Sequence, residues 1–289
     1  MVSLMRNALL AMGLVLSLGA AHAFDLGDVL KQAIEQGTQK SSQQGAEKSD
    51  SPLGGLGGFS QEEEIAIGRQ IAGNLLGASP LVKDKQLQKY VNNVGRWVAA
   101  QSERPDLEWH FGVIESNDVN AFAAPGGYIF VTRGLYRLLT NEAELAGVLA
   151  HEVGHVIKKH HLKILQQSRL VDIGAKLFAK QAGENDKIKN LIGSGAEVVA
   201  RSLDKDAEFE ADRIAVVLAA RAGYEAYGLP EVLQQIGHVA KDDGSVALLF
   251  KTHPHPDDRL AKLGDAMDER FDKLKGQALG SRFYRIKPL

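Results

Sequence analysis

The stretch His151-Glu152-Val153-Gly154-His155 decides most of what this sequence predicts. It spells HExxH and lies in a strongly apolar segment that reads as a helix. In a helix, a spacing of four places His151 and His155 one turn apart on the same face, where two imidazoles can bind one zinc ion. Glu152 is rotated by about 100° from His151. It would therefore flank the metal, where it could take a proton from a zinc-bound water.

A catalytic zinc site needs a third protein ligand and leaves the fourth position for water. One candidate is His161, six residues after His155, as in the pattern HExxHxxGxxH. Lys158 stands where that pattern has the glycine that lets the chain turn back. We therefore expect the helix to continue and His161 to point away from the metal. On this interpretation His160 and His161 lie at an interface or on the surface.

A second candidate ligand comes from a later helix, expected over residues 207–218. Among the glutamates after the HExxH motif, only Glu208 is followed four residues later by an aspartate, Asp212. These two share one helical face, whereas Glu210 is turned by about 200° from Glu208. Glu208 and Asp212 have apolar neighbours, where carboxylates need partners. Glu208 could bind zinc and Asp212 could support a ligand by hydrogen bonding.

A third candidate is the loop Thr252-His253-Pro254-His255-Pro256. Its two X-Pro steps favour an extended, stiff backbone, and a histidine on a rigid loop could reach a cleft. His255 is better explained as the start of the following helix. The residues alone leave open whether His253 reaches the metal.

Four motifs occur in a family's order. They are Asn120 to Ile129 (NAFAAPGGYI), HEVGH, Glu-Phe-Glu-Ala-Asp at 208–212 and His-Pro-His-Pro-Asp-Asp-Arg at 253–259. From about Phe59 to Asp272 the chain resembles the peptidase family of CAAX prenyl proteases and bacterial stress metalloproteases. This is a gluzincin class of zinc metallopeptidases, and the resemblance is to its soluble, exported branch.

The resemblance implies roles for individual residues. It implies one Zn²⁺ per chain, bound by His151, His155 and Glu208. Glu152 would be the catalytic base, and Asp212 would steady the site.

The resemblance also implies roles for a strand and a loop. Asn120, Ala121, Phe122 and Ala123 would belong to a strand at the edge of the sheet, along which the substrate backbone aligns. An exposed edge can pair with an extended peptide largely independently of its side chains. His253 would approach the zinc, where it could restrain activity or support the oxyanion.

The function implied is that of a zinc-dependent endopeptidase that cleaves unfolded or misfolded proteins of the cell envelope. Peripheral contact with a membrane or with outer-membrane assembly proteins is a further implication. The alternative is a latent, zinc-bound, chaperone-like periplasmic protein in which His253 closes the metal site. Glu152 favours the enzyme, because a structural zinc site needs no base.

Composition places few limits on this picture. The chain has 289 residues, 44% of them hydrophobic, with a formal net charge of -2, as in ordinary globular proteins. The near-neutral balance argues against nucleic acid as a main partner. The absence of cysteine excludes disulfides.

The first 23 residues are typical of a signal peptide. Arg6 is followed by an apolar run over residues 8–20 and by the small-x-small cleavage pattern Ala21-His22-Ala23. We therefore expect export, most simply to the periplasm. No later segment reaches the roughly 18 apolar residues of a transmembrane helix.

The remaining chain divides by composition. Residues 24–58 read as a short segment and a linker rich in Gly, Ser and Gln. Residues 59–275 would form the metallopeptidase domain, and residues 276–289 a C-terminal tail. The amphipathic stretch 163–203 could cover the cleft, touch a membrane or pack on the domain.

The expected fold class is α+β, mainly α-helical: a zincin-like domain with a small antiparallel sheet beside the active-site helix. A capping box at Ser60 opens a first helix. A second is expected from about residue 84 to 101, with an apolar stripe made of Leu87, Val91, Val94 and Val98. Residues 107–115 and 128–132 are β-rich, with a turn at 125–127. The chain after Asn141 is expected to be mostly helical, and Asn141 with Glu144 resembles a capping arrangement for the helix that carries HExxH.

Overall fold

The computed structural model describes residues 58–167, 203–239, 243–253 and 255–285. The predicted signal peptide, nearly all of the linker and most of the 163–203 stretch lie outside these residues. Within the described ranges, none of the helices is both long enough and apolar enough to cross a membrane.

The helix that carries HExxH, α5 (Glu142–Ile157), is the central element of the domain. It begins at Asn141, whose side chain accepts a hydrogen bond from the backbone N–H of Glu144 (2.9 Å), as the capping pattern predicts. Every residue from Glu142 to Val156 is buried. The helix contacts α3, α8, α9 and the sheet, so its histidines are held from several sides.

Two helices precede the sheet, and the first begins at the predicted cap. α2 (Gln61–Ala78) starts with the reciprocal Ser60–Glu63 capping box, and α3 (Lys85–Ala99) starts at Asp84. The apolar stripe expected on α3 is fully buried; it consists of Leu87, Val91, Val94 and Val98.

The sheet contains β1 (His110–Ile114), β2 (Ala121–Ala124) and β3 (Tyr128–Thr132), in the order β1-β3-β2. The α+β class is confirmed. The sheet is small, as expected, but it is mixed, and only one of its two strand pairs is antiparallel. β2 and β3 are antiparallel because the short turn η1 (Pro125–Gly127) joins them, whereas β1 and β3 run parallel. The chain passes from β1 to the far side of β3 before it returns, which places β2 at an edge.

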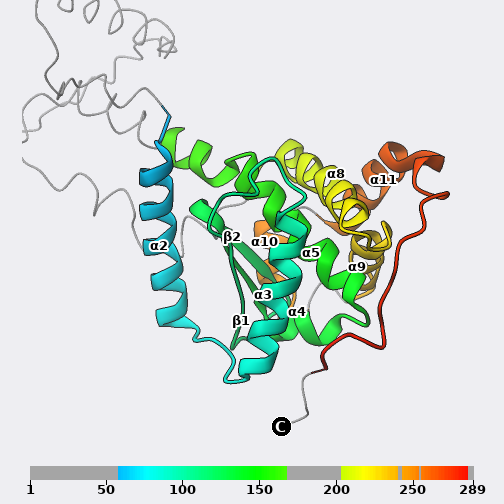
Figure 1. Ribbon diagram of the computed structural model, residues 1–289, viewed down its shortest axis with the longest axis horizontal. Coiled ribbons are helices and arrows are strands. Elements are labelled where there is room, and N and C mark those ends of the chain that lie inside the picture. The colour runs from blue at the N-terminus through cyan, green and yellow to red at the C-terminus, as the bar shows by residue number, and fades with distance from the viewer. Residues whose placement is uncertain (1–57, 168–202, 240–242, 254, 286–289) are drawn as a thin grey trace, which may run out of the picture. The chain divides into compact units, whose positions relative to one another are not determined.

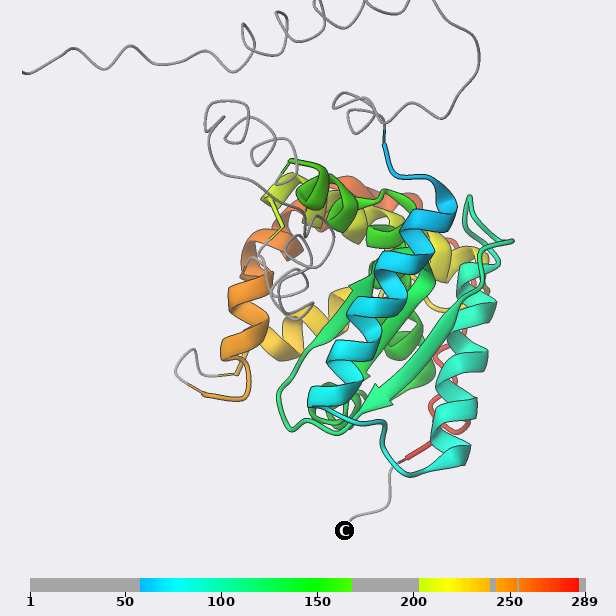
Figure 2. The ribbon, with the colours of Figure 1, turned by 90° about the vertical axis from the view of Figure 1, so that its left-hand side faces the viewer.

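The sheet packs on both faces, with α2 on one side and α5 on the other (Figures 1 and 2). Ile129 and Val131 point into the main core, which includes residues of α3 and α5, while Phe130 belongs to a smaller cluster with residues of α2. The turn beneath α2 requires glycine. Gly126 has φ of 74°, and a Cβ there would lie 2.7 Å from the Cα of Ile65.

The second half of the domain is helical. It contains α4 (Arg133–Leu138) before α5, then α8 (Lys205–Arg221), α9 (Gly228–Gly237), α10 (Ala247–Thr252), α11 (Pro256–Met267) and η2 (Asp268–Arg270). α8 lies close against α5, and a Cβ on Gly154 would come within 3.2 Å of the Cα of Ala211. The glycine inside HEVGH therefore lets α8 approach the two histidines.

The residues expected to form a C-terminal tail pack against the domain. Phe283 is 6% exposed and stacks on Tyr136, with ring centroids 5.1 Å apart. Arg282 forms an ion pair with the buried Glu142. The domain therefore continues beyond the predicted boundary at residue 275.

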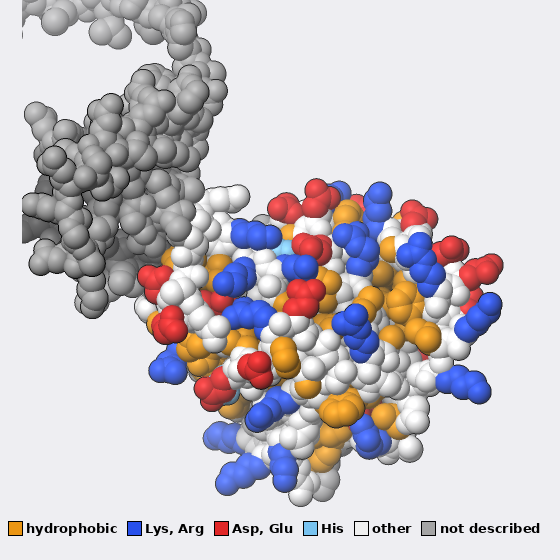
Figure 3. Space-filling view, turned by 45° about the horizontal axis from the view of Figure 1, so that its top comes forward, with side chains coloured by type: hydrophobic (Ala, Val, Ile, Leu, Met, Phe, Trp, Pro, Cys, Tyr) orange, Lys and Arg blue, Asp and Glu red, His pale blue; other side chains and the backbone are white. Residues whose placement is uncertain are grey.

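The surface carries charges of both signs. On the face in Figure 3, acidic and basic side chains are interspersed, with hydrophobic side chains between them. Only a small area of this face belongs to histidine, in keeping with the burial of His151, His155, His160 and His161.

Candidate metal centre

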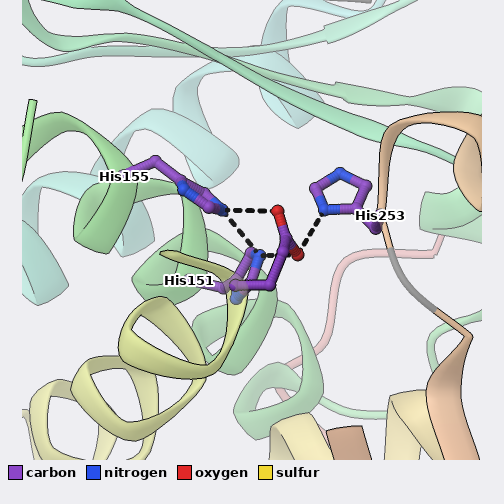
Figure 4. Close-up of side chains that lie close together, drawn as sticks. His151, His155 and His253 are labelled. Carbon is purple, nitrogen blue, oxygen red and sulfur yellow. Dashed lines mark hydrogen bonds and ion pairs between the residues drawn. The ribbon is translucent and has the colours of Figure 1, made fainter. Parts of the chain in front are cut away.

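Four buried side chains from three parts of the fold converge on one point (Figure 4). His151 and His155 come from α5, Glu208 from α8, and His253 from the residue after α10. One ligand atom from each of the four lies within 4.8 Å of all the others. The structure thus brings together the three predicted ligands and the histidine that the sequence left open.

The donor atoms are arranged as a cation would require. The Nε2 atoms of His151 and His155 are 2.9 Å apart, and the Glu208 carboxylate oxygens lie 3.6 and 3.5 Å from them. Glu208 Oε1 is buried and has no hydrogen-bond partner among the described residues. Lone pairs that face each other at this distance need a proton or a metal ion between them. Two imidazoles and a carboxylate are the ligand types that zinc prefers.

Asp212 orients the first histidine. Its Oδ1 lies 2.9 Å from His151 Nδ1, so a proton on Nδ1 is held there and the Nε2 lone pair is directed at the cluster. Asp212 in turn accepts two hydrogen bonds from Arg259 of α11, from Nε (2.9 Å) and Nη2 (2.5 Å). Burial raises the pKa of Asp212, but the Arg259 charge and hydrogen bonds outweigh it and hold the pKa well below its usual range.

Arg259 has a role that sequence reasoning missed. Arg259 belongs to the motif at residues 253–259, but no function was predicted for it. It is 4% exposed and lies between Asp212 and Glu208, with Nη1 3.9 Å from Glu208 Oε2. A lone arginine in the first turn of a charged helix carries no local sign of burial, so only its position in the motif could have marked it.

The protonation states favour metal binding in most of the cluster. Burial lowers the pKa of His155 far below its ordinary value, so its imidazole is neutral. Burial opposes ionisation of Glu208, but the neighbouring histidines keep its pKa low. For His151, burial and Arg259 lower the pKa, yet hydrogen bonds to Asp212 and Glu208 raise it to about 9. A metal bound by His151 would therefore displace a proton.

Glu152 lies beside the cluster. It is 3% exposed and lines a cavity of about 40 Å³ together with Ala121, His151 and His253. Burial is the main cause that raises the pKa of Glu152. A cavity of this size has room for a water molecule beside Glu152.

The four residues of the predicted substrate strand occupy different environments. β2 pairs with β3 on one side, and within the described ranges no strand pairs with its other side. Ala121 lines the cavity beside Glu152, and Ala123 is buried in the main core. Phe122 packs toward α2 on the opposite face. Asn120, just before the strand, is fully buried.

The expectations for His160 and His161 need correction. α5 does not continue past Lys158, because Lys159 adopts a left-handed conformation with φ of 55°, and a helical segment resumes at His160. Both histidines are buried, at 3% and 7% exposure, and not on the surface. Neither belongs to the ligand cluster. The pattern marked no glycine at the turn, so the reversal at Lys159 was not visible in the sequence.

His255 is placed as predicted, at the start of a helix. It precedes α11 as its N-cap residue and stands outside the ligand cluster.

Comparisons with known proteins agree with this geometry. The model of peptidase family M48 matches residues 85–267, a span that contains the whole cluster. The chain is 30% identical over 211 residues to the beta-barrel assembly-enhancing protease of Yersinia pestis, covering 70% of this chain and 43% of that protein. The protein of the same name from Escherichia coli (strain K12) is 29% identical, and the match covers 69% of this chain and 42% of that protein.

A eukaryotic relative is more distant. The mitochondrial metalloendopeptidase OMA1 of Schizosaccharomyces pombe is 27% identical over 180 residues, which cover 62% of this chain and 53% of that protein. The chain thus spans about half or less of the length of these curated relatives.

Proposed function

The chain belongs to peptidase family M48, a family of zinc metalloendopeptidases, and we propose that it hydrolyses peptide bonds in unfolded or misfolded proteins of the cell envelope. The observation that carries this proposal is the buried cluster of His151, His155 and Glu208 with Glu152 beside it. A carboxylate with a raised pKa next to a metal-binding cluster is what peptide hydrolysis needs and a structural site does not.

We assign the protein ligands of zinc to His151, His155 and Glu208. When bound there, zinc would polarise the scissile carbonyl and make a water molecule more acidic. Asp212 and Arg259 would keep His151 in the tautomer whose Nε2 faces the metal.

Glu152 would move the proton. Its carboxylate accepts a proton from the attacking water and returns it to the leaving amine nitrogen. The buried surroundings that raise its pKa make both transfers easier, since the protonated and ionised forms become closer in free energy.

The edge strand β2 would position the substrate. An extended peptide that pairs with its free edge would pass Ala121, which lines the cavity beside Glu152. Pairing through backbone groups recognises conformation more than sequence, which suits unfolded chains of varied composition.

The proposed location and partners are supported by the relatives' names and by the expected signal peptide. Two bacterial relatives are named for enhancing beta-barrel assembly, which supports a periplasmic protein that acts on, or contacts, outer-membrane assembly proteins. Residues 1–23, which would direct the export, lie outside the described part of the chain.

A second candidate function rests on His253. Its Nδ1 lies 2.7 Å from Glu208 Oε2, inside the ligand cluster. If this imidazole took the fourth metal position, the protein would be latent, with a binding or chaperone-like role until the loop moved.

The test is cleavage of an unfolded protein, reduced and alkylated to prevent refolding, by the full chain before and after zinc removal. We expect cleavage with zinc, loss after chelation and recovery when zinc is restored, with a folded control protein left intact. Firm zinc binding without cleavage would contradict the proposed activity and favour the latent protein.

A further inference from the structure

A second pair of side chains contacts the proposed ligand His155 from behind. The Nδ1 atoms of His155 and His160 are 2.9 Å apart, and Nε2 of His160 lies 3.2 Å from Glu210 Oε2. His155, His160 and Glu210 form a continuous hydrogen-bonded line from the metal cluster to the surface of α8. None of the roles assigned so far uses His160 or Glu210.

The chemistry of Glu210, His160 and His155 fixes which atom donates and which accepts in each hydrogen bond. Glu210 is 37% exposed and lies 3.6 Å from Lys158 Nζ, so at neutral pH it is a carboxylate and can only accept. His160 must then donate from Nε2, and in the neutral ring this leaves Nδ1 as an acceptor. His155 can fill that acceptor only by donating from its own Nδ1. The remaining nitrogen of His155, Nε2, is left with its lone pair directed at the cluster.

The backbone reversal at Lys159 makes this contact possible. A residue in the left-handed conformation ends α5, and the Nζ of Lys159 lies 3.3 Å from the buried Glu64. Had α5 continued straight, residue 160 would have lain farther along the helix axis. The reversal instead folds the His160 ring back onto His155, with ring centroids 5.1 Å apart.

We propose that His160 and Glu210 are positioning residues that hold His155 in its metal-binding tautomer and orientation. The proposal rests on the assignment of His155 as a zinc ligand. The two ligand histidines of α5 would then be oriented by separate devices, Asp212 with Arg259 for His151 and His160 with Glu210 for His155. Partners of this kind change metal affinity or activity by roughly 10-fold to 100-fold when they are removed.

The test compares His160→Asn with His160→Leu, since the two side chains have similar size and shape. The Asn Oδ1 can stand in for the Nδ1 acceptor, whereas Leu offers none. We expect His160→Leu to weaken zinc affinity by about 10-fold to 100-fold, measured by competition with a chromogenic chelator. His160→Asn should recover most of that loss.

Two further measurements separate positioning from packing. The visible absorption spectrum of the cobalt-substituted protein should change for His160→Leu and resemble wild type for His160→Asn. His161→Leu is the matched control, because His161 is also buried and contacts His155 through its ring, with centroids 5.9 Å apart. It should leave the affinity within a few-fold of wild type.

Glu210→Ala tests the other end of the line at a partly exposed position, where loss of folding is not expected. It should lower zinc affinity by several-fold, while Arg213→Ala, exposed on the same helix, should not. Equal zinc affinities for His160→Asn and His160→Leu, or an unchanged affinity for Glu210→Ala, would overturn the proposal. Failure of the wild-type chain to bind zinc would instead overturn the metal assignment itself.

Discussion

Replacement of Arg259 by methionine should destabilise the domain strongly. The Arg259 and Asp212 side chains are only 5% and 2% exposed, and they share two hydrogen bonds. Removal of one partner from such a buried pair costs about 3–5 kcal/mol, because Asp212 would keep only its contact with His151. For a domain of this size, the expected loss is on the order of 6–20 °C in Tm.

Thermal unfolding of the zinc-free and zinc-loaded proteins measures this effect. Arg259→Lys keeps the charge but loses the two-pronged contact, so its Tm should fall between wild type and Arg259→Met. Arg213→Met, at an exposed position of α8, should stay within about 0.5 kcal/mol of wild type. A loss below about 1 kcal/mol for Arg259→Met would refute the reasoning that the pair is a buried, mutually dependent unit.

Three other changes have defined outcomes. Glu208→Ala should lose zinc on dialysis, as measured by atomic absorption, and a full metal content would contradict its assignment as a ligand. His253→Ala should raise kcat/KM several-fold if the imidazole occupies the fourth position, whereas a fall with zinc retained would indicate a supporting role. Burial opposes ionisation of Glu142, but hydrogen bonds from Arg282 and two tyrosines outweigh it and lower its pKa below the ordinary 4.5. Its stabilising contribution is therefore complete above that value and is lost as the pH falls below it. Urea unfolding between pH 3 and 6 should show a shallower acid loss for Arg282→Ala than for wild type, and identical slopes would contradict this.

Local periodicity predicted the parts of the site that lie on one helix. The spacing of His151 and His155 and the shared face of Glu208 and Asp212 follow from 3.6 residues per turn, and burial agrees with both patterns. The caps at Ser60 and Asn141 were also readable, because a cap depends on residues three positions apart.

Features that depend on distant contacts could not be read in this way. The pairing of β1 with β3 is set by where the chain returns after β2, not by the strand residues themselves. The partner of Arg259 lies 47 residues away, and nothing in the first turn of α11 marks it as buried. The reversal at Lys159 occurs at a residue type that rarely adopts a positive φ, so the placement of His160 was hidden as well.

The measurement that tests the central claim most directly compares wild type with Glu152→Gln in the same two assays. Zinc content and cleavage of an unfolded protein are measured on each sample. The account predicts one zinc per chain in both proteins. It also predicts that Glu152→Gln lowers the cleavage rate by about 100-fold or more, since about 100-fold is the lower end of the rate loss expected when a general base is removed. Cleavage at the wild-type rate by Glu152→Gln would contradict the role of Glu152 as the base.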